Sequence, residues 1–526
     1  MPTLRTFCLL ALLLLTASAL SVAAAPAPTV EVTFAPSLRS PPITGRLYVF
    51  LSERQSGEPM RGPNWFAPEP FFRVEVENFA PGETCVIGDA AAAFPAPLSE
   101  LRPGEYRAQA VLDHDFYAHH PANGAGNLYS DVVTWSVGEH GAAPLRLTLT
   151  NTIAAAEFND TVHVREVRLL SRLLSDFHGH DVYEFAGIVL PPSYEDEPDR
   201  YYPTIYEIPG FGGDHRRALR YARRGFTGDD DGVEFIRVML SGNCKWGHHV
   251  YADSATNGPR GAALVEEMIP HIEREFRAIP RPTARLVTGH SSGGWSSLWL
   301  QVRYPDVFGG VWSTAPDPVD FRDFQRINIY ASPPDNVFLE ADGSPRPLAR
   351  RGETPVVWYE QFSNMDDVLG RGGQLRSFEA VFSPLDDDGL PRRLWDRTTG
   401  QIDPQVAEPW QAYDVSLLLA ENWPQLREKL AGKLHIFTGT LDTFYLEGAV
   451  LLLAEELAAL GSDAQITIVE GADHSSLMTQ ELRQQIRREM VETVLRHHGA
   501  PAAQTRPRAP RRPTVQAVDA RRAVPR

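Results

Sequence analysis

The chain is 526 residues long, which exceeds one ordinary domain, and its 43% hydrophobic content is enough to bury substantial cores. We therefore expect two domains with terminal appendages. The formal net charge of −17 argues against a nucleic-acid partner, because binding to the phosphate backbone needs a basic footprint.

Residues 1–25 have the form of a secretory signal peptide. Arg5 precedes a strongly apolar run, and small residues follow up to the expected cleavage site. An uncleaved anchor is the alternative. No later stretch has the length and apolar character of a transmembrane segment, so we expect a mature chain that is secreted or periplasmic. An exported protein can oxidise its thiols, but whether Cys85 and Cys244 pair stays open.

Residues 26–152 predict an N-terminal, immunoglobulin-like β-sandwich. Short alternating runs are separated by Pro, Gly and Asn, as in antiparallel sandwiches. These runs are residues 30–34, 46–50, 72–76, 106–111 and 145–149. We expect this domain to cover the catalytic domain rather than to bind a polymer, and to be separable from it near residues 151–165.

The second domain, residues 160–500, predicts an α/β-hydrolase fold with a mostly parallel sheet. Its first informative strand, residues 203–208, leads into Pro209-Gly210-Phe211-Gly212-Gly213. Glycines there let the backbone approach a ligand closely. The amide of Phe211 is therefore a candidate donor of an oxyanion hole.

A Gly-x-Ser-x-Gly pentapeptide, residues 289–293, follows the short apolar strand 285–288 and precedes a predicted helix at 295–304. This is the sequence form of a nucleophile elbow, in which small residues two before and two after the serine leave room for a strained turn. The pattern predicts Ser291 as a nucleophile. The amide of Ser292, the next residue, would be the other oxyanion donor.

The acid and the histidine of a triad should follow the serine in the chain, in that order. A strand at residues 433–437 leads to Asp442, and after a helix at 445–460 a second strand, 465–469, leads to His474. Parallel strands deliver such loops to one edge of the sheet. The sequence thus predicts Ser291, His474 and Asp442 as the triad.

Two other aspartates compete for the acid's role. Asp317 follows the strand at residues 308–313, and a triad acid can also be carried there. Asp473, next to His474, fits a solvated turn better.

Residues 332–430 are more residues than a single crossover helix needs, and they predict a cap over the active-site edge. Trp358, Tyr359 and Phe362 of this cap could line a pocket.

No metal is expected. The runs 229–232 and 386–389 are acidic, but neither matches a complete calcium-binding loop, so solvated turns are favoured. Residues 501–526 predict a disordered basic tail, because few apolar residues there offset chain entropy.

Several motifs resemble the putative esterase family of α/β-hydrolases, which includes esterase D, enterochelin esterases, feruloyl esterases and mycolyltransferases. The resemblance spans about residues 165–500 and rests on Tyr202-Pro203-Thr204-Ile205-Tyr206, Asp253-Ser254, Asn257-Gly258-Pro259, the helix end at 269–277 and Gly289-His290-Ser291-Ser292-Gly293-Gly294. One departure concerns the oxyanion loop, where family members often carry His-Gly and this chain has Pro209-Gly210.

Together these features predict an exported serine hydrolase that cleaves a small-molecule or polymer-linked carboxylic ester without a cofactor. Ser291 would attack the carbonyl carbon, His474 would shuttle the proton, and Asp442 would orient His474. An acyltransferase using the same acyl-enzyme is the rival within this fold. A non-catalytic binding protein with a decayed hydrolase domain is the rival from another class, although the complete set of triad residues argues against decay.

Overall fold

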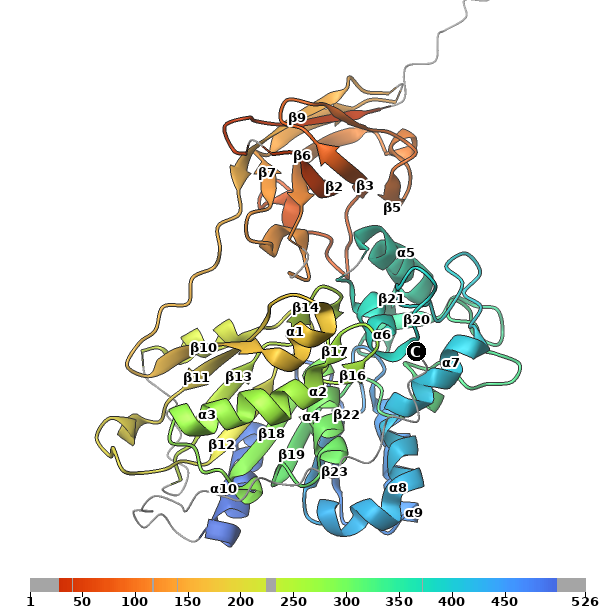
Figure 1. Cartoon of the computed structure of the whole chain (residues 1–526). Helices are drawn as coiled ribbons and strands as arrows, with labels where there is room; N and C mark the ends of the chain where they lie inside the picture. The colour runs from red at the N-terminus through yellow and green to blue at the C-terminus, as the bar shows by residue number, and fades with distance from the viewer. Residues whose placement is uncertain are drawn as a thin grey trace, which may run out of the picture.

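The computed structural model describes residues 28–39, 41–115, 118–139, 141–223, 233–370 and 372–498. The expected signal peptide, the acidic run 229–232 and the basic tail lie outside the described residues. Figure 1 shows an upper lobe built from the N-terminal strands and a larger lower lobe that holds the helices and the second large sheet.

The upper lobe is a single hydrogen-bonded sheet of nine strands that curls into a half-barrel. The strands are β1 (Val30–Phe34), β2 (Ile43–Ser52), β3 (Phe71–Phe79), β4 (Cys85–Ile87), β5 (Ala92–Phe94), β6 (Gly104–Asp113), β7 (Leu128–Ser130), β8 (Val133–Val137) and β9 (Leu145–Thr152). Eight of them run in the order β4-β1-β9-β7-β6-β2-β3-β5. The ninth, β8, pairs with β6 and lies outside this order. The five predicted runs all lie in strands, but a division into two sandwiched sheets is not confirmed.

Strand β2 is buried on both faces. Successive strand side chains point to opposite sides of a sheet, and here Leu47, Val49 and Leu51 enter the core of the upper lobe. Tyr48 and Phe50, which alternate with them, join the main hydrophobic core of the lower lobe. The two lobes therefore share buried apolar contacts, and their separation near residues 151–165 stays a prediction.

The lower lobe contains an eight-stranded mixed sheet in the order β10-β11-β13-β12-β18-β19-β22-β23. Strands β10 and β11 pair antiparallel, as do β11 and β13, and every pairing from β13 to β23 is parallel. The strands are β10 (Val164–Ser171), β11 (Val182–Val189), β12 (Thr204–Ile208), β13 (Ile236–Leu240), β18 (Arg285–His290), β19 (Gly310–Thr314), β22 (Leu434–Gly439) and β23 (Gln465–Val469).

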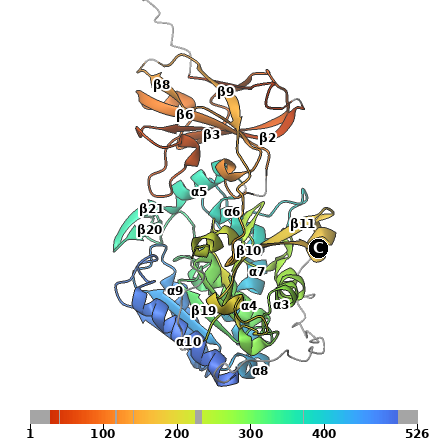
Figure 2. The same cartoon turned by 90° about the vertical axis from the view of Figure 1, so that its left-hand side faces the viewer.

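Helices cover both faces of this sheet. Leu286 of β18 packs in the cluster that includes apolar side chains of α10 (Gln480–His498), whereas its neighbour Val287 packs in the main core. That main core includes side chains of α3 (Ile269–Glu275), α4 (Ser292–Arg303), α8 (Val415–Leu430) and α9 (Glu447–Ala459). Figure 2 shows α10 and α3 on opposite sides of the lobe. The result is a three-layer arrangement with the sheet in the middle.

Between β19 and β22, the residues that precede α8 form a substructure beneath the upper lobe (Figure 1). It contains the hairpin β20 (Pro347–Arg351) and β21 (Thr354–Trp358), then α5 (Tyr359–Leu369), α6 (Gln374–Phe382) and α7 (Pro404–Trp410). Helix α5 packs against β3 and β5, and the hydroxyl of Tyr48 donates a hydrogen bond of 2.7 Å to the carbonyl of Leu369.

Shorter elements complete the lower lobe. They are α1 (Arg172–His178), α2 (Arg260–Ala263), the two-stranded pair β14 (Asn243–Cys244) and β15 (Gly247–His248), and the pair β16 (Asp253–Ser254) and β17 (Gly258–Pro259). Cys85 and Cys244 are free thiols in this structure. Within the described ranges, no helix combines the length and the apolar character that crossing a membrane requires.

Candidate active site

Ser291 stands at a sharp turn between β18 and α4. Its φ of 62° and ψ of −127° lie in a region that residues with a side chain rarely adopt. The turn is held by backbone hydrogen bonds, since the amide of Ser291 donates to the carbonyl of Thr314 at 3.1 Å. This geometry is that of a nucleophile elbow.

The two glycines of the pentapeptide are required by close backbone contacts. A Cβ on Gly289 would collide with the backbone of Gly293, and a Cβ on Gly293 would collide with the carbonyl of Ile208. Strand β18, the turn and β12 thus approach each other at distances that only glycine permits.

His474 lies in the loop after β23 and is paired with Asp442, from the loop after β22. The Nδ1–H of His474 donates to Oδ2 of Asp442 at 2.7 Å. Asp442 is fully buried, and its Oδ1 also accepts a 2.8 Å hydrogen bond from the amide of Phe444. Burial opposes the imidazolium, but the hydrogen bond and charge of Asp442 outweigh it and raise the pKa of His474.

Asp317 occupies a different position. Its carboxylate accepts a 2.6 Å hydrogen bond from the hydroxyl of Ser292 and a 3.4 Å one from that of Ser291. Burial raises the pKa of Asp317 to about 6, although these hydrogen bonds and His474 act in the opposite direction. Among the described residues, neither Asp317 nor Ser291 has a hydrogen bond to the His474 ring.

The two candidate oxyanion donors flank Ser291. The amide of Ser292 begins α4, where the first amides of a helix have no acceptor within the helix. The loop with Phe211 follows β12, and a Cβ on Gly210 would lie 3.3 Å from Cβ of Ser291. Backbone of this loop therefore passes directly beside the serine.

His290 packs against His474, with ring centroids 4.6 Å apart. Its Nδ1 lies 3.0 Å from the hydroxyl oxygen of Thr314. Burial lowers the pKa of His290 to about 4, and the neighbouring His474 adds to this effect. His290 is consequently neutral at physiological pH, so it places no second positive charge beside a protonated His474.

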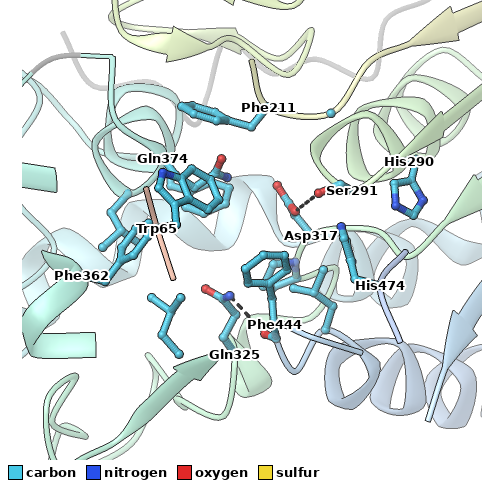
Figure 3. Close-up of a pocket in the computed structure, with 16 residues that line it drawn as sticks. Trp65, Phe211, His290, Ser291, Asp317, Gln325, Phe362, Gln374, Phe444 and His474 are labelled. Atoms are coloured by element: carbon cyan, nitrogen blue, oxygen red, sulfur yellow. Dashed lines mark hydrogen bonds between the residues drawn. The ribbon is translucent and has the colours of Figure 1, made fainter. Parts of the chain in front are cut away.

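These side chains open into a cavity of about 290 Å³. Figure 3 shows Ser291, Asp317 and His474 on one side of it and a group of aromatic rings on the other. The lining residues are Trp65, Gly210, Phe211, His290, Ser291, Asp317, Pro318, Gln325, Leu348, Phe362, Gln374, Leu375, Phe378, Phe444, Leu446 and His474. The lining is thus mainly apolar, with a few polar groups near the serine.

Of the three aromatic residues suggested for the pocket, only Phe362 lines it. Tyr359 is buried behind the cavity, where its hydroxyl donates to Gln325 at 2.7 Å, and Trp358 is 39% exposed. The sequence reasoning did not identify Trp65 or Gln374. Trp65 is an aromatic residue in a mainly polar loop and Gln374 begins an amphipathic helix, and neither pattern by itself indicates a cavity residue.

Comparisons with known proteins place the chain in a family. The model of the family described as putative esterase matches residues 185–477. No curated protein matches the chain. Three similar solved structures are a ferulic acid esterase, a fluorophosphonate-binding serine hydrolase of Staphylococcus aureus and an S-formylglutathione hydrolase of Agrobacterium tumefaciens.

The sequence identities to these three are 14%, 14% and 13%, and the TM-scores are 0.41, 0.38 and 0.39. Each alignment covers 64% of this chain and 100%, 99% and 98% of the other chain, respectively. The family match alone spans more than half of the chain. The chain therefore belongs to the putative esterase family and is a carboxylic ester hydrolase.

Proposed function

We propose that this protein is an exported serine esterase that works through an acyl-enzyme on Ser291, with His474 as general base and Asp442 as the residue that orients it. The observation that carries this proposal is the combination of an elbow serine and a carboxylate-bound histidine at the same cavity. Export rests on the form of residues 1–25 alone.

Each residue has a defined task in the proposed reaction. His474 takes the hydroxyl proton of Ser291 as the oxygen bonds to the ester carbonyl carbon, and the amides of Ser292 and Phe211 donate to the resulting oxyanion. His474 then gives the proton to the departing alcohol. Water then bonds to the acyl carbon as His474 takes one of its protons, and the bond to Oγ of Ser291 breaks as His474 returns that proton to Oγ, which releases the carboxylic acid and the free serine.

The hydroxyl of Ser291 is oriented toward Asp317 in the free protein, at 3.4 Å. Catalytic hydrogen bonds are often long or misaligned without substrate and tighten in the Michaelis complex. The raised pKa of His474 suits its role, because the buried carboxylate of Asp442 stabilises the imidazolium that forms when His474 accepts the proton.

A fluorophosphonate probe tests the nucleophile. The mature wild-type protein should be labelled, and Ser291→Ala should not. Ser292→Ala is the matched control, because it removes a neighbouring hydroxyl but keeps the backbone amide, and it should still be labelled. Labelling of Ser291→Ala at the wild-type rate would place the nucleophile elsewhere.

We also propose that water, rather than an alcohol, accepts the acyl group. Both the esterase and an acyltransferase would form the same intermediate, so the test follows its breakdown. The enzyme is incubated with an activated ester and graded concentrations of simple sugars and alcohols, and free acid is quantified against new ester. Free acid should dominate throughout, and an excess of new ester at millimolar acceptor would make the protein a transferase.

The N-terminal strands are proposed to form an immunoglobulin-like sandwich that covers the catalytic lobe. Their curled sheet and its shared core with the lower lobe support this reading.

The proposed export is tested by sequencing the amino terminus of the protein recovered from the exporting host. Cleavage of the signal peptide should fall near residue 25.

A further inference from the structure

The upper lobe contributes a side chain to the catalytic cavity. Trp65 belongs to the segment between β2 and β3, yet it lines the same cavity as Ser291 and His474. In Figure 3 its indole lies across the cavity from Ser291. We propose that Trp65 is a specificity-determining residue, whose ring forms the far wall of the substrate pocket and limits the size of the ester group that fits there. This inference rests on the proposed function.

The loop that carries Trp65 is fixed by its own hydrogen bonds. Oδ1 of Asn64 accepts from the amides of Phe66 and Ala67, at 2.9 and 3.2 Å, which closes a tight turn around the tryptophan. The ring of His120 lies 2.8 Å from the carbonyl oxygen of Gly62, at the start of the loop. A wall that limits substrate size must resist displacement, and this anchoring provides the resistance.

Trp65 contacts each of the three segments that frame the catalytic groups. Its ring centroid lies 5.7 Å from that of Phe211 in the candidate oxyanion loop and 5.2 Å from that of Phe362 in α5. It lies 6.3 Å from the ring of Phe444, which in turn packs edge-on against His474 at 5.1 Å. The indole is therefore packed among three rings, and its edge-on contacts with Phe362 and Phe444 have the geometry that aromatic pairs prefer.

The rings that contact Trp65 belong to Phe211, Phe362 and Phe444, so this part of the wall is apolar, while Gln325, Gln374 and the catalytic residues supply the polar groups of the cavity. An apolar wall offers a substrate no hydrogen bond, so it discriminates by size and shape. Pockets of this kind distinguish groups by about 10-fold to 200-fold per methylene that fits or clashes. Removing the indole should extend the cavity and shift the preference to longer esters.

The test compares wild type with Trp65→Ala in the full mature chain. Two series of substrates are used, 4-nitrophenyl esters of increasing acyl length and acetate esters of increasing alcohol length. The ratio of kcat/KM for the eight-carbon substrate to that for the two-carbon substrate should rise about tenfold in one of the series. Trp65→Phe, which keeps part of the wall, should give a smaller rise.

Trp358→Ala is the matched control, because Trp358 is an exposed tryptophan outside the cavity, and its ratio should equal that of wild type. A ratio that falls or stays constant for Trp65→Ala in both series overturns the proposal, including the case in which all esters slow down equally. If Trp65→Ala does not fold, the Trp65→Phe ratio decides by the same criterion. Failure of wild type to react with the fluorophosphonate probe would instead refute the proposed function.

Discussion

Replacing Asp442 by Asn tests the proposed catalytic machinery most directly, because it changes one atom in a fully buried site. Oδ1 of Asp442 accepts from the amide of Phe444, and Oδ2 accepts from Nδ1–H of His474. An asparagine that keeps the Phe444 hydrogen bond must present its NH2 group to Nδ1. That group can only donate, so Nδ1 becomes the acceptor and the ring proton moves to Nε2.

The ring nitrogen that should receive the serine proton is then already protonated. The flipped amide would restore the correct tautomer but would set its NH2 against the amide of Phe444, which leaves a buried donor unpaired at about 1–3 kcal/mol. We therefore expect Asp442→Asn to lower kcat by about 10⁴, the loss typical of a triad acid. This corresponds to about 5 kcal/mol of transition-state stabilisation.

The assay is steady-state hydrolysis of a 4-nitrophenyl ester, with thermal unfolding to verify the fold. Asp473→Asn is the matched control, since Asp473 is adjacent to His474 but accepts hydrogen bonds only within its own loop, from Ser475 and Ser476. It should retain kcat within about threefold, as expected for a group outside the reaction. The reasoning is refuted if Asp442→Asn loses less than about a hundredfold while Asp317→Asn shows the larger loss.

The remaining predictions concern pH and the shared core. Neutral His474 is the active form and its pKa is raised, so wild-type kcat/KM should fall on acidification through a pKa above 6.5. Asp317→Asn removes one of the negative charges that raise the pKa of His474, so the fall in kcat/KM should occur at a lower pH in this variant. Asp317 has its pKa raised from 3.8 to about 6, so its ionisation costs the folded state on the order of 2–3 kcal/mol above pH 6, and this cost disappears as the pH falls toward 4. Urea unfolding should accordingly find Asp317→Asn more stable than wild type at pH 8 and no more stable at pH 4. A chain that begins at residue 154 would expose the face that Tyr48 and Phe50 cover, and it should aggregate or melt well below the full chain; a monomeric fragment with the full chain's melting temperature would contradict the shared core.

The sequence predicted the elements whose signals are local. The runs 30–34 and 465–469 coincide with β1 and β23, and the helix expected at 445–460 is α9, Glu447–Ala459. The three-residue strands β4, β5 and β7 were not predicted, because three residues are too few to show a hydrophobic periodicity. The glycines around Ser291 also gave a local signal, although only the contact of Gly289 with Gly293 lies within the pentapeptide, and Gly293 itself approaches Ile208 of β12.

The tertiary structure shows which carboxylate meets His474. The sequence favoured Asp442 and kept Asp317 as its rival, because both follow parallel strands, and the hydrogen bonds of the two carboxylates separate them. It also decided that the upper lobe lines the cavity. Trp65 and Ser291 are far apart in the chain, and no local pattern records such a contact. Packing brings them together, because Tyr48 and Phe50 on the outer face of β2 are buried against the lower lobe.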